Sequence, residues 1–86
     1  MKIALMMRSA WEDSELVLLG ESLDAEFVSP WTAGNDVKVG MSRLPSGTRY
    51  YAWKRSFNKN DSEWWVSALD LGELARKIKE VMEDES

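Results

Sequence analysis

The chain has 86 residues, of which 44% are hydrophobic and 30% charged, and its 15 acidic and 11 basic side chains give a formal net charge of -4. It has five tryptophans but no cysteine and no histidine. That composition excludes disulfide scaffolds, thiolate or imidazole metal sites, cysteine nucleophiles and Ser-His-Asp relays. A chain of this length holds one core, so we expect a single domain over residues 1–86.

The N-terminal third allows two interpretations. Residues 2–7 fit a strand, and residues 12–28 place Leu16, Leu19, Leu23 and Phe27 at helical spacing before Pro30. Residues 16–19, followed by Gly20, also fit a strand that turns into a second strand over residues 23–28. A helix and a hairpin therefore both remain open, and either would supply core residues and an acidic outer surface.

The middle of the chain predicts a β-hairpin. Residues 37–43 alternate in polarity, residues 44–47 offer Pro and Gly for a turn, and residues 48–56 are rich in aromatic and β-favouring side chains. A four-residue loop would pair Arg43 with Thr48, and every other cross-strand pair follows from that register. We expect a third strand over residues 63–69, which completes a meander.

This register fixes which side chains share a face. The predicted core face carries Val37, Val39, Met41, Tyr50, Ala52 and Lys54, together with Trp64, Val66 and Ala68 of the third strand. The outer face carries Lys38, Gly40, Ser42, Arg49, Tyr51, Trp53, Arg55 and Trp65. The odd-numbered rings should thus meet water while their even-numbered neighbours are buried.

The last segment predicts an amphipathic helix. Apolar residues recur at helical spacing from Leu71 to Met82, and Asp70 with Glu73 fits a capping box at the start. The predicted fold class is therefore α+β. It consists of a small antiparallel sheet, made of the meander and an N-terminal strand, packed by a C-terminal helix and one N-terminal helix.

The outer sheet face is the strongest candidate for a binding site. Its candidate residues are Lys38, Arg49, Tyr51, Trp53, Arg55 and Trp65. Trp, Tyr and Arg concentrate binding energy at protein interfaces, and the same side chains can stack bases and contact phosphates. Three structural explanations compete: the rings are buried under the N-terminal segment, Tyr51 shields Gly40, or the rings stack locally on arginines.

A second candidate is the acidic block, because residues 9–36 contain no Lys or Arg. Its candidate surface residues are Glu12, Asp13, Glu15, Glu21, Asp24 and Glu26. The plain interpretation is a solvated face. Two alternatives remain: the block docks on a basic partner, or it pairs with the basic hairpin in the same or another copy, which predicts self-association weakened by salt.

No pattern in the chain indicates catalysis, and we expect no catalytic residue, metal site or cofactor. Adjacent acids such as Glu12 and Asp13 diverge on a helix, and no serine has a histidine to activate it. No signal peptide and no run of about 18 apolar residues is present, so we expect a cytoplasmic protein without a membrane partner.

The resulting hypothesis is a small acidic binding protein that inhibits or modulates a larger protein or nucleoprotein by occupying its surface. Immunity proteins and phage-encoded inhibitors act in this mode, an analogy that rests on size and charge alone. The alternative is a nucleic-acid-binding accessory or regulatory protein that uses the basic aromatic face. A homodimer is a further open alternative.

Overall fold

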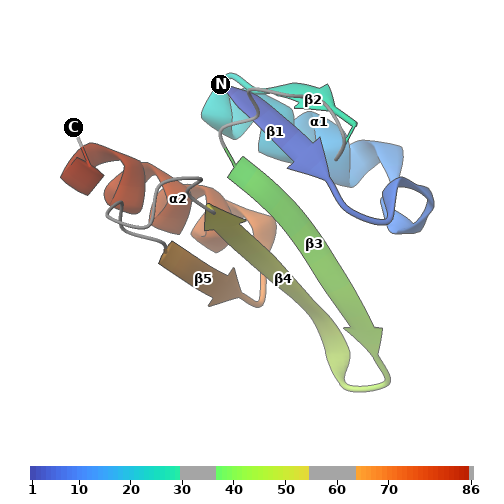
Figure 1. Ribbon diagram of the computed structural model, residues 1–86. Coiled ribbons are helices and arrows are strands. Elements are labelled where there is room, and N and C mark those ends of the chain that lie inside the picture. Colours follow the sequence, from blue (N-terminus) through green and yellow to red (C-terminus); the bar gives the residue numbers. More distant parts are fainter. Residues whose placement is uncertain (30–36, 55–63, 86) are drawn as a thin grey trace.

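The computed structural model describes residues 1–29, 37–54 and 64–85 (Figure 1). Five strands form one sheet in the order β2-β1-β3-β4-β5. The strands are β1 (Lys2–Leu5), β2 (Glu26–Val28), β3 (Val37–Leu44), β4 (Gly47–Lys54) and β5 (Trp64–Ala68). The helices are the short 3-10 helix η1 (Arg8–Ala10), α1 (Asp13–Leu23) and α2 (Leu71–Glu85). The predicted α+β class is confirmed.

The sheet is mixed, whereas the sequence predicted an antiparallel one. Strand β1 runs parallel to both β2 and β3, with α1 as the crossover between β1 and β2. Only β3, β4 and β5 form an antiparallel meander. The predicted hairpin register is confirmed, since Arg43 lies opposite Thr48. The prediction for β1 was wrong because its neighbours come from distant segments, which local patterning does not specify.

The segment after α1 is the other correction. A helix does form, but it ends at Leu23, and residues 26–28 are a strand rather than its last turn. Asp24 adopts a left-handed conformation with φ of 48°, and the Ala25 N–H donates to the Gly20 carbonyl at 2.9 Å. Aspartate tolerates this conformation better than most residues. Phe27 keeps helical spacing from Leu23 but lies in β2 opposite Ile3.

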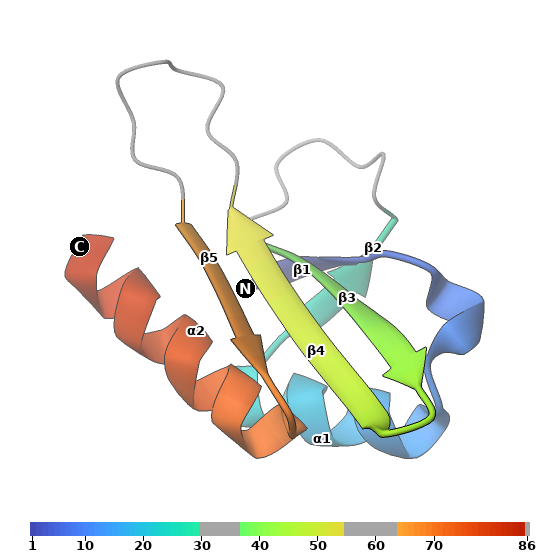
Figure 2. The same ribbon diagram turned by 90° about the horizontal axis from the view of Figure 1, so that it is seen from below.

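Both helices pack on the same face of the sheet (Figure 2). The core between the two layers contains Ile3, Leu5, Leu19, Leu23, Val37, Val39, Met41, Tyr50, Ala52, Leu74, Ala75 and Ile78. Helix α2 begins as predicted, because the Glu73 N–H donates to Asp70 Oδ1 at 2.8 Å. The predicted strand phase is also confirmed: Tyr50 and Ala52 are buried, and Trp65 points away from the helices.

Candidate functional site

The face of the sheet opposite the helices carries the predicted binding residues, and we call it the open face. Four neighbouring strands contribute positions to it: Ala4 and the adjoining Met6, then Lys38, Gly40, Ser42, Arg49, Tyr51, Trp53, Trp65 and Ser67. Ala4 and Gly40 are buried, and the other positions are partly or fully exposed. These positions alternate with the core residues along each strand. The α-helices α1 and α2 both lie on the other side, so neither covers this face.

Three rings form an aromatic cluster on the open face: Tyr51 and Trp53 from β4 and Trp65 from β5. Trp65 is 60% exposed. Its ring centroid lies 5.6 Å from that of Tyr51, with 38° between the ring planes, which is a favourable separation for an aromatic pair. The pair holds two large rings at a water-facing surface.

Trp53 has a second role as a cover for Gly40. A Cβ atom added at Gly40 would lie 3.5 Å from Cζ3 and 3.6 Å from Cη2 of Trp53, so the indole packs over the glycine backbone. The sequence suggested that Tyr51 would shield this gap, but the structure assigns the task to Trp53. The cluster is not buried under the N-terminal segment either, since Tyr51 and Trp53 remain partly exposed.

Two predicted cations flank the cluster. Lys38 lies opposite Trp53, which in turn lies opposite Trp65, so a basic residue and two indoles form a row across three strands. Arg49 lies opposite Ser42, toward the hairpin turn. Neither cation is paired with an acid within residues 1–29, 37–54 and 64–85. The sixth predicted residue, Arg55, lies outside the described residues.

The open face continues round the edge of β5 into a shallow hollow. Its lining includes Arg49, Ser67 and Leu69, with Glu73 and Lys77 from α2. Lys77 Nζ donates to the Ser67 carbonyl at 2.7 Å and pairs with Glu73 at 3.2 Å. The α2 side of the hollow is thus internally compensated, whereas Arg49 contributes uncompensated positive charge.

Most of the predicted acidic surface lies away from the open face, whereas Glu26 shares the side of the sheet that carries Ala4. Five of its residues are exposed: Glu12, Asp13, Glu21, Asp24 and Glu26. All of them except Glu26 belong to α1 or its caps. Glu26 is on the edge strand β2. The structure therefore separates an acidic helix from a basic aromatic sheet face.

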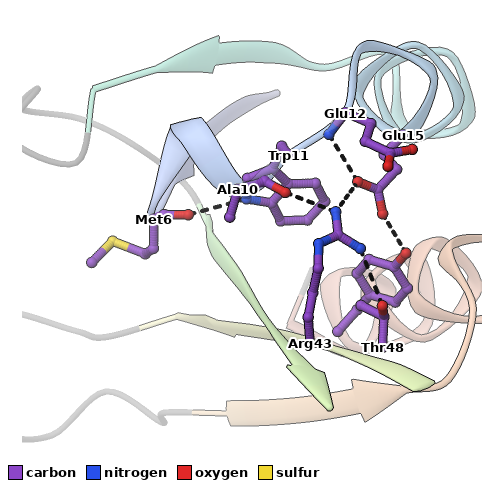
Figure 3. Close-up of polar contacts among 8 residues, drawn as sticks. Met6, Ala10, Trp11, Glu12, Glu15, Arg43 and Thr48 are labelled. Carbon is purple, nitrogen blue, oxygen red and sulfur yellow. Dashed lines mark hydrogen bonds and ion pairs between the residues drawn. The ribbon is translucent and has the colours of Figure 1, made fainter. Parts of the chain in front are cut away.

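Glu15 does not belong to the acidic surface. It is buried, and its carboxylate accepts hydrogen bonds from Arg43 at 2.6 Å, from the Glu12 N–H at 2.9 Å and from the Tyr50 hydroxyl (Figure 3). Arg43 also donates to the Ala10 carbonyl at 2.7 Å and to Thr48 Oγ1 at 3.1 Å. This network ties the start of α1 to the end of the hairpin.

The network shifts the pKa of each of its members. Burial alone would raise the pKa of Glu15, but the hydrogen bonds from Tyr50, the Glu12 backbone and Arg43 outweigh burial and lower it below its ordinary value. Burial, with the hydrogen bond to Glu15, raises the pKa of Tyr50 to about 12. The pair with Glu15 raises the pKa of Arg43. The carboxylate stays ionised and fully bonded, which fits a structural role.

Sequence reasoning missed this network because its members are far apart along the chain. One local signal was available: Glu12 and Glu15 have capping-box spacing at the start of α1. That spacing indicates where the helix starts and that the Glu15 side chain turns back toward the backbone of Glu12. It does not reveal Arg43 or Tyr50, which the folded hairpin brings to the carboxylate.

Comparison with protein-family models, with curated proteins and with solved structures finds no match for this chain. The functional argument therefore depends on the surfaces of the chain itself. None of the helices in its described part has the length and apolar character needed to cross a bilayer. The open face is the surface whose composition points most directly to a ligand.

Proposed function

We propose that this chain is a small non-catalytic binding protein that inhibits or modulates a larger macromolecule by occupying its surface with the open face. The observation that carries the proposal is the aromatic cluster on a sheet face that neither α1 nor α2 covers: Trp65 is exposed, Tyr51 and Trp53 are partly exposed, and Lys38 and Arg49 lie beside them. An exposed apolar patch rimmed by polar residues is typical of an interaction site.

The composition of the open face supports a protein as the partner. Trp, Tyr and Arg are the side chains that most often act as binding anchors, and a pre-formed ring pair loses little conformational freedom when it binds. The acidic residues of α1 lie on the other layer and would repel a long polyanion that approached the molecule. We therefore expect the partner to be a protein whose surface is acidic only where it meets Lys38 and Arg49, and not a long polyanion.

The test is capture of the partner from lysate with immobilised wild-type chain and with Trp65→Ala. We expect Trp65→Ala to lose most of the captured protein, because the most exposed ring of the cluster is removed. The matched control is Leu18→Ala, which removes a side chain that is 48% exposed on α1, on the other side of the sheet from the cluster. Equal capture by wild type and Trp65→Ala would reject the proposal.

One observation favours a second candidate, a nucleic-acid-binding accessory or regulatory protein. Two rings 5.6 Å apart beside two cations on an open sheet resemble the platforms on which single-stranded bases stack. Binding of labelled single strands at low salt tests this candidate. We then expect affinity to fall steeply with salt and Arg49→Ala to reduce the slope, whereas no binding at low salt removes the candidate.

A further inference from the structure

The outward side of α1 is an exposed surface that neither the core nor the proposed function uses. Val17 and Leu18 are 58% and 48% exposed although both are large and apolar. Asp13 and Glu21 lie four residues before and after Val17, so an acidic residue flanks the apolar pair at each end. We call Asp13, Val17, Leu18 and Glu21 the α1 face.

The α1 face and the open face complement each other in charge. Asp13 and Glu21 are eight residues apart in a helix, a separation of about 12 Å at 1.5 Å per residue. On the open face, Lys38 and Arg49 are offset by four positions along neighbouring strands, a separation of about 14 Å. Two acids and two cations are therefore presented at nearly the same spacing. Asp13 already pairs with Arg8 at 3.9 Å, so Glu21 is the acid that contributes most of the attraction.

The side chains that lie between the charged residues also match on the two faces. Between Asp13 and Glu21 the helix exposes Val17 and Leu18. Between Lys38 and Arg49 the sheet carries Tyr51 and the indole of Trp53 over Gly40, and both rings are partly exposed. A helix laid along β3 and β4 would thus place apolar side chains on rings and acids on cations.

These two faces cannot meet within one molecule, because α1 packs on the opposite side of the sheet (Figure 2). We infer that the α1 face of one copy docks on the open face of a second copy. The docked helix would add a third layer to a sheet whose two own helices cover only one face. Contact of one open face with another is disfavoured, since it would bring Lys38 and Arg49 against their own counterparts.

An interface between two different faces has a defined consequence. Each copy keeps one unused face, so association adds further copies instead of closing into a dimer. Because the contact depends on exposed charges, high salt should weaken it. It also occupies the surface assigned to the partner, so self-association and partner binding would exclude each other.

The experiment is analytical ultracentrifugation of the full chain over a range of concentrations, at low and at high salt. We expect the average mass to rise with concentration at low salt, and the association constant to fall roughly tenfold at high salt. A chain that stays monomeric at low salt up to its solubility limit would overturn the inference.

Charge reversal identifies the two faces. In the proposed contact Glu21 lies against Arg49 and Asp13 against Lys38. Glu21→Lys and Arg49→Glu should each make the chain monomeric, and the double variant should recover self-association because the pair is restored with opposite sign. Lys79→Glu on the exposed surface of α2 makes the same charge change as Arg49→Glu and should associate like wild type. Failure of the double variant to recover, with every variant folded by circular dichroism, would contradict the proposed contact.

This result is separable from the proposed function. Glu21→Lys leaves the open face intact, so its capture of a partner should equal or exceed that of wild type. Capture that requires Trp65 in a chain that never self-associates would overturn this inference alone. Salt-sensitive self-association in a chain that captures nothing would overturn the proposed function alone.

Discussion

The Glu15 carboxylate shows how one residue's role depends on groups that are distant in sequence. Its donors Arg43 and Tyr50 are 28 and 35 residues away along the chain, and they approach only when the hairpin lies beside the start of α1. In the sequence, Glu15 is one of several acids in a block without cations. Apart from its capping-box spacing from Glu12, nothing local distinguishes it from Asp13, which is almost fully exposed. Five of the six acids assigned to this surface are exposed, and Glu15 is the one that folding buries.

Removing this carboxylate should destabilise the fold. We expect Glu15→Ala to lower the free energy of unfolding by about 2 kcal/mol, because the buried Tyr50 hydroxyl loses its acceptor. Asp13→Ala, two positions earlier on the exposed side of α1, should change it by less than about 0.5 kcal/mol. Urea unfolding measures both. Similar losses in the two variants would show that the network contributes little.

The same network predicts stability changes at both pH extremes. The lowered pKa of Glu15 stabilises the folded state at pH above the ordinary value of 4.5, and this contribution disappears as pH falls through the folded pKa. The raised pKa of Tyr50 stabilises below its ordinary value of 10.0, and that contribution disappears as pH rises toward about 12.

Tyr50→Phe tests the contribution of Tyr50 to the network. It should remove the part of the alkaline loss that comes from Tyr50 and also reduce the acid loss, because the Tyr50 hydroxyl lowers the pKa of Glu15 more than the Glu12 backbone or Arg43 does. Urea unfolding of wild type and Tyr50→Phe at several pH values provides the comparison. Identical alkaline curves would be inconsistent with the Tyr50 hydroxyl as a titrating member of the network.

At the scale of elements, the sequence specified those whose signals are local. Turn residues 44–47 and the alternation on either side predicted the β3–β4 register correctly, from Arg43 opposite Thr48 to Lys38 opposite Trp53. The apolar periodicity and Asp70 predicted α2. Strand β2 was left undecided between the last turn of a helix and a strand over residues 23–28, because three residues carry no period of their own and Phe27 continued the helical spacing. Its parallel pairing with β1 depends on the whole crossover and not on any local pattern.

The cap of α2 allows a test at this scale. Asp70→Ala should lower stability by about 1 kcal/mol, because the Glu73 N–H loses its acceptor at Oδ1. Asp70→Ser keeps an acceptor at the same position and should retain most of that stability. Thermal melts followed by circular dichroism distinguish the two variants. Equal melting temperatures for Ala and Ser would mean that this cap is not stabilising.

At the scale of the whole molecule, the two helices and the sheet form two layers that use their surfaces differently. The core between the two layers is packed around Leu74 and Ile78, which are fully buried. The open face presents rings that the core does not need, and α1 presents most of the acids. The sequence predicted which residues of each strand face the core, because polar and apolar residues alternate along the strands. The absence of a described helix over the open face was not, since both helices could have been placed on either side.

This division predicts that stability and binding respond to different substitutions. Leu74→Asp should prevent folding, because it places an unpaired charge in the core. Trp65→Ala should change the free energy of unfolding by no more than about 1 kcal/mol, since most of the ring already meets water. Melting temperatures of the two variants test the separation. A large loss of stability in Trp65→Ala would assign that ring to the fold.

The most direct test of the proposed binding surface is hydroxyl-radical footprinting of the chain alone and in complex with its captured partner. Binding through the open face predicts that Trp65, Trp53 and Tyr51 lose reactivity in the complex while Leu18 on α1 stays reactive. Protection of Leu18 with Trp65 still fully reactive would contradict that account and assign the contact to the acidic helix.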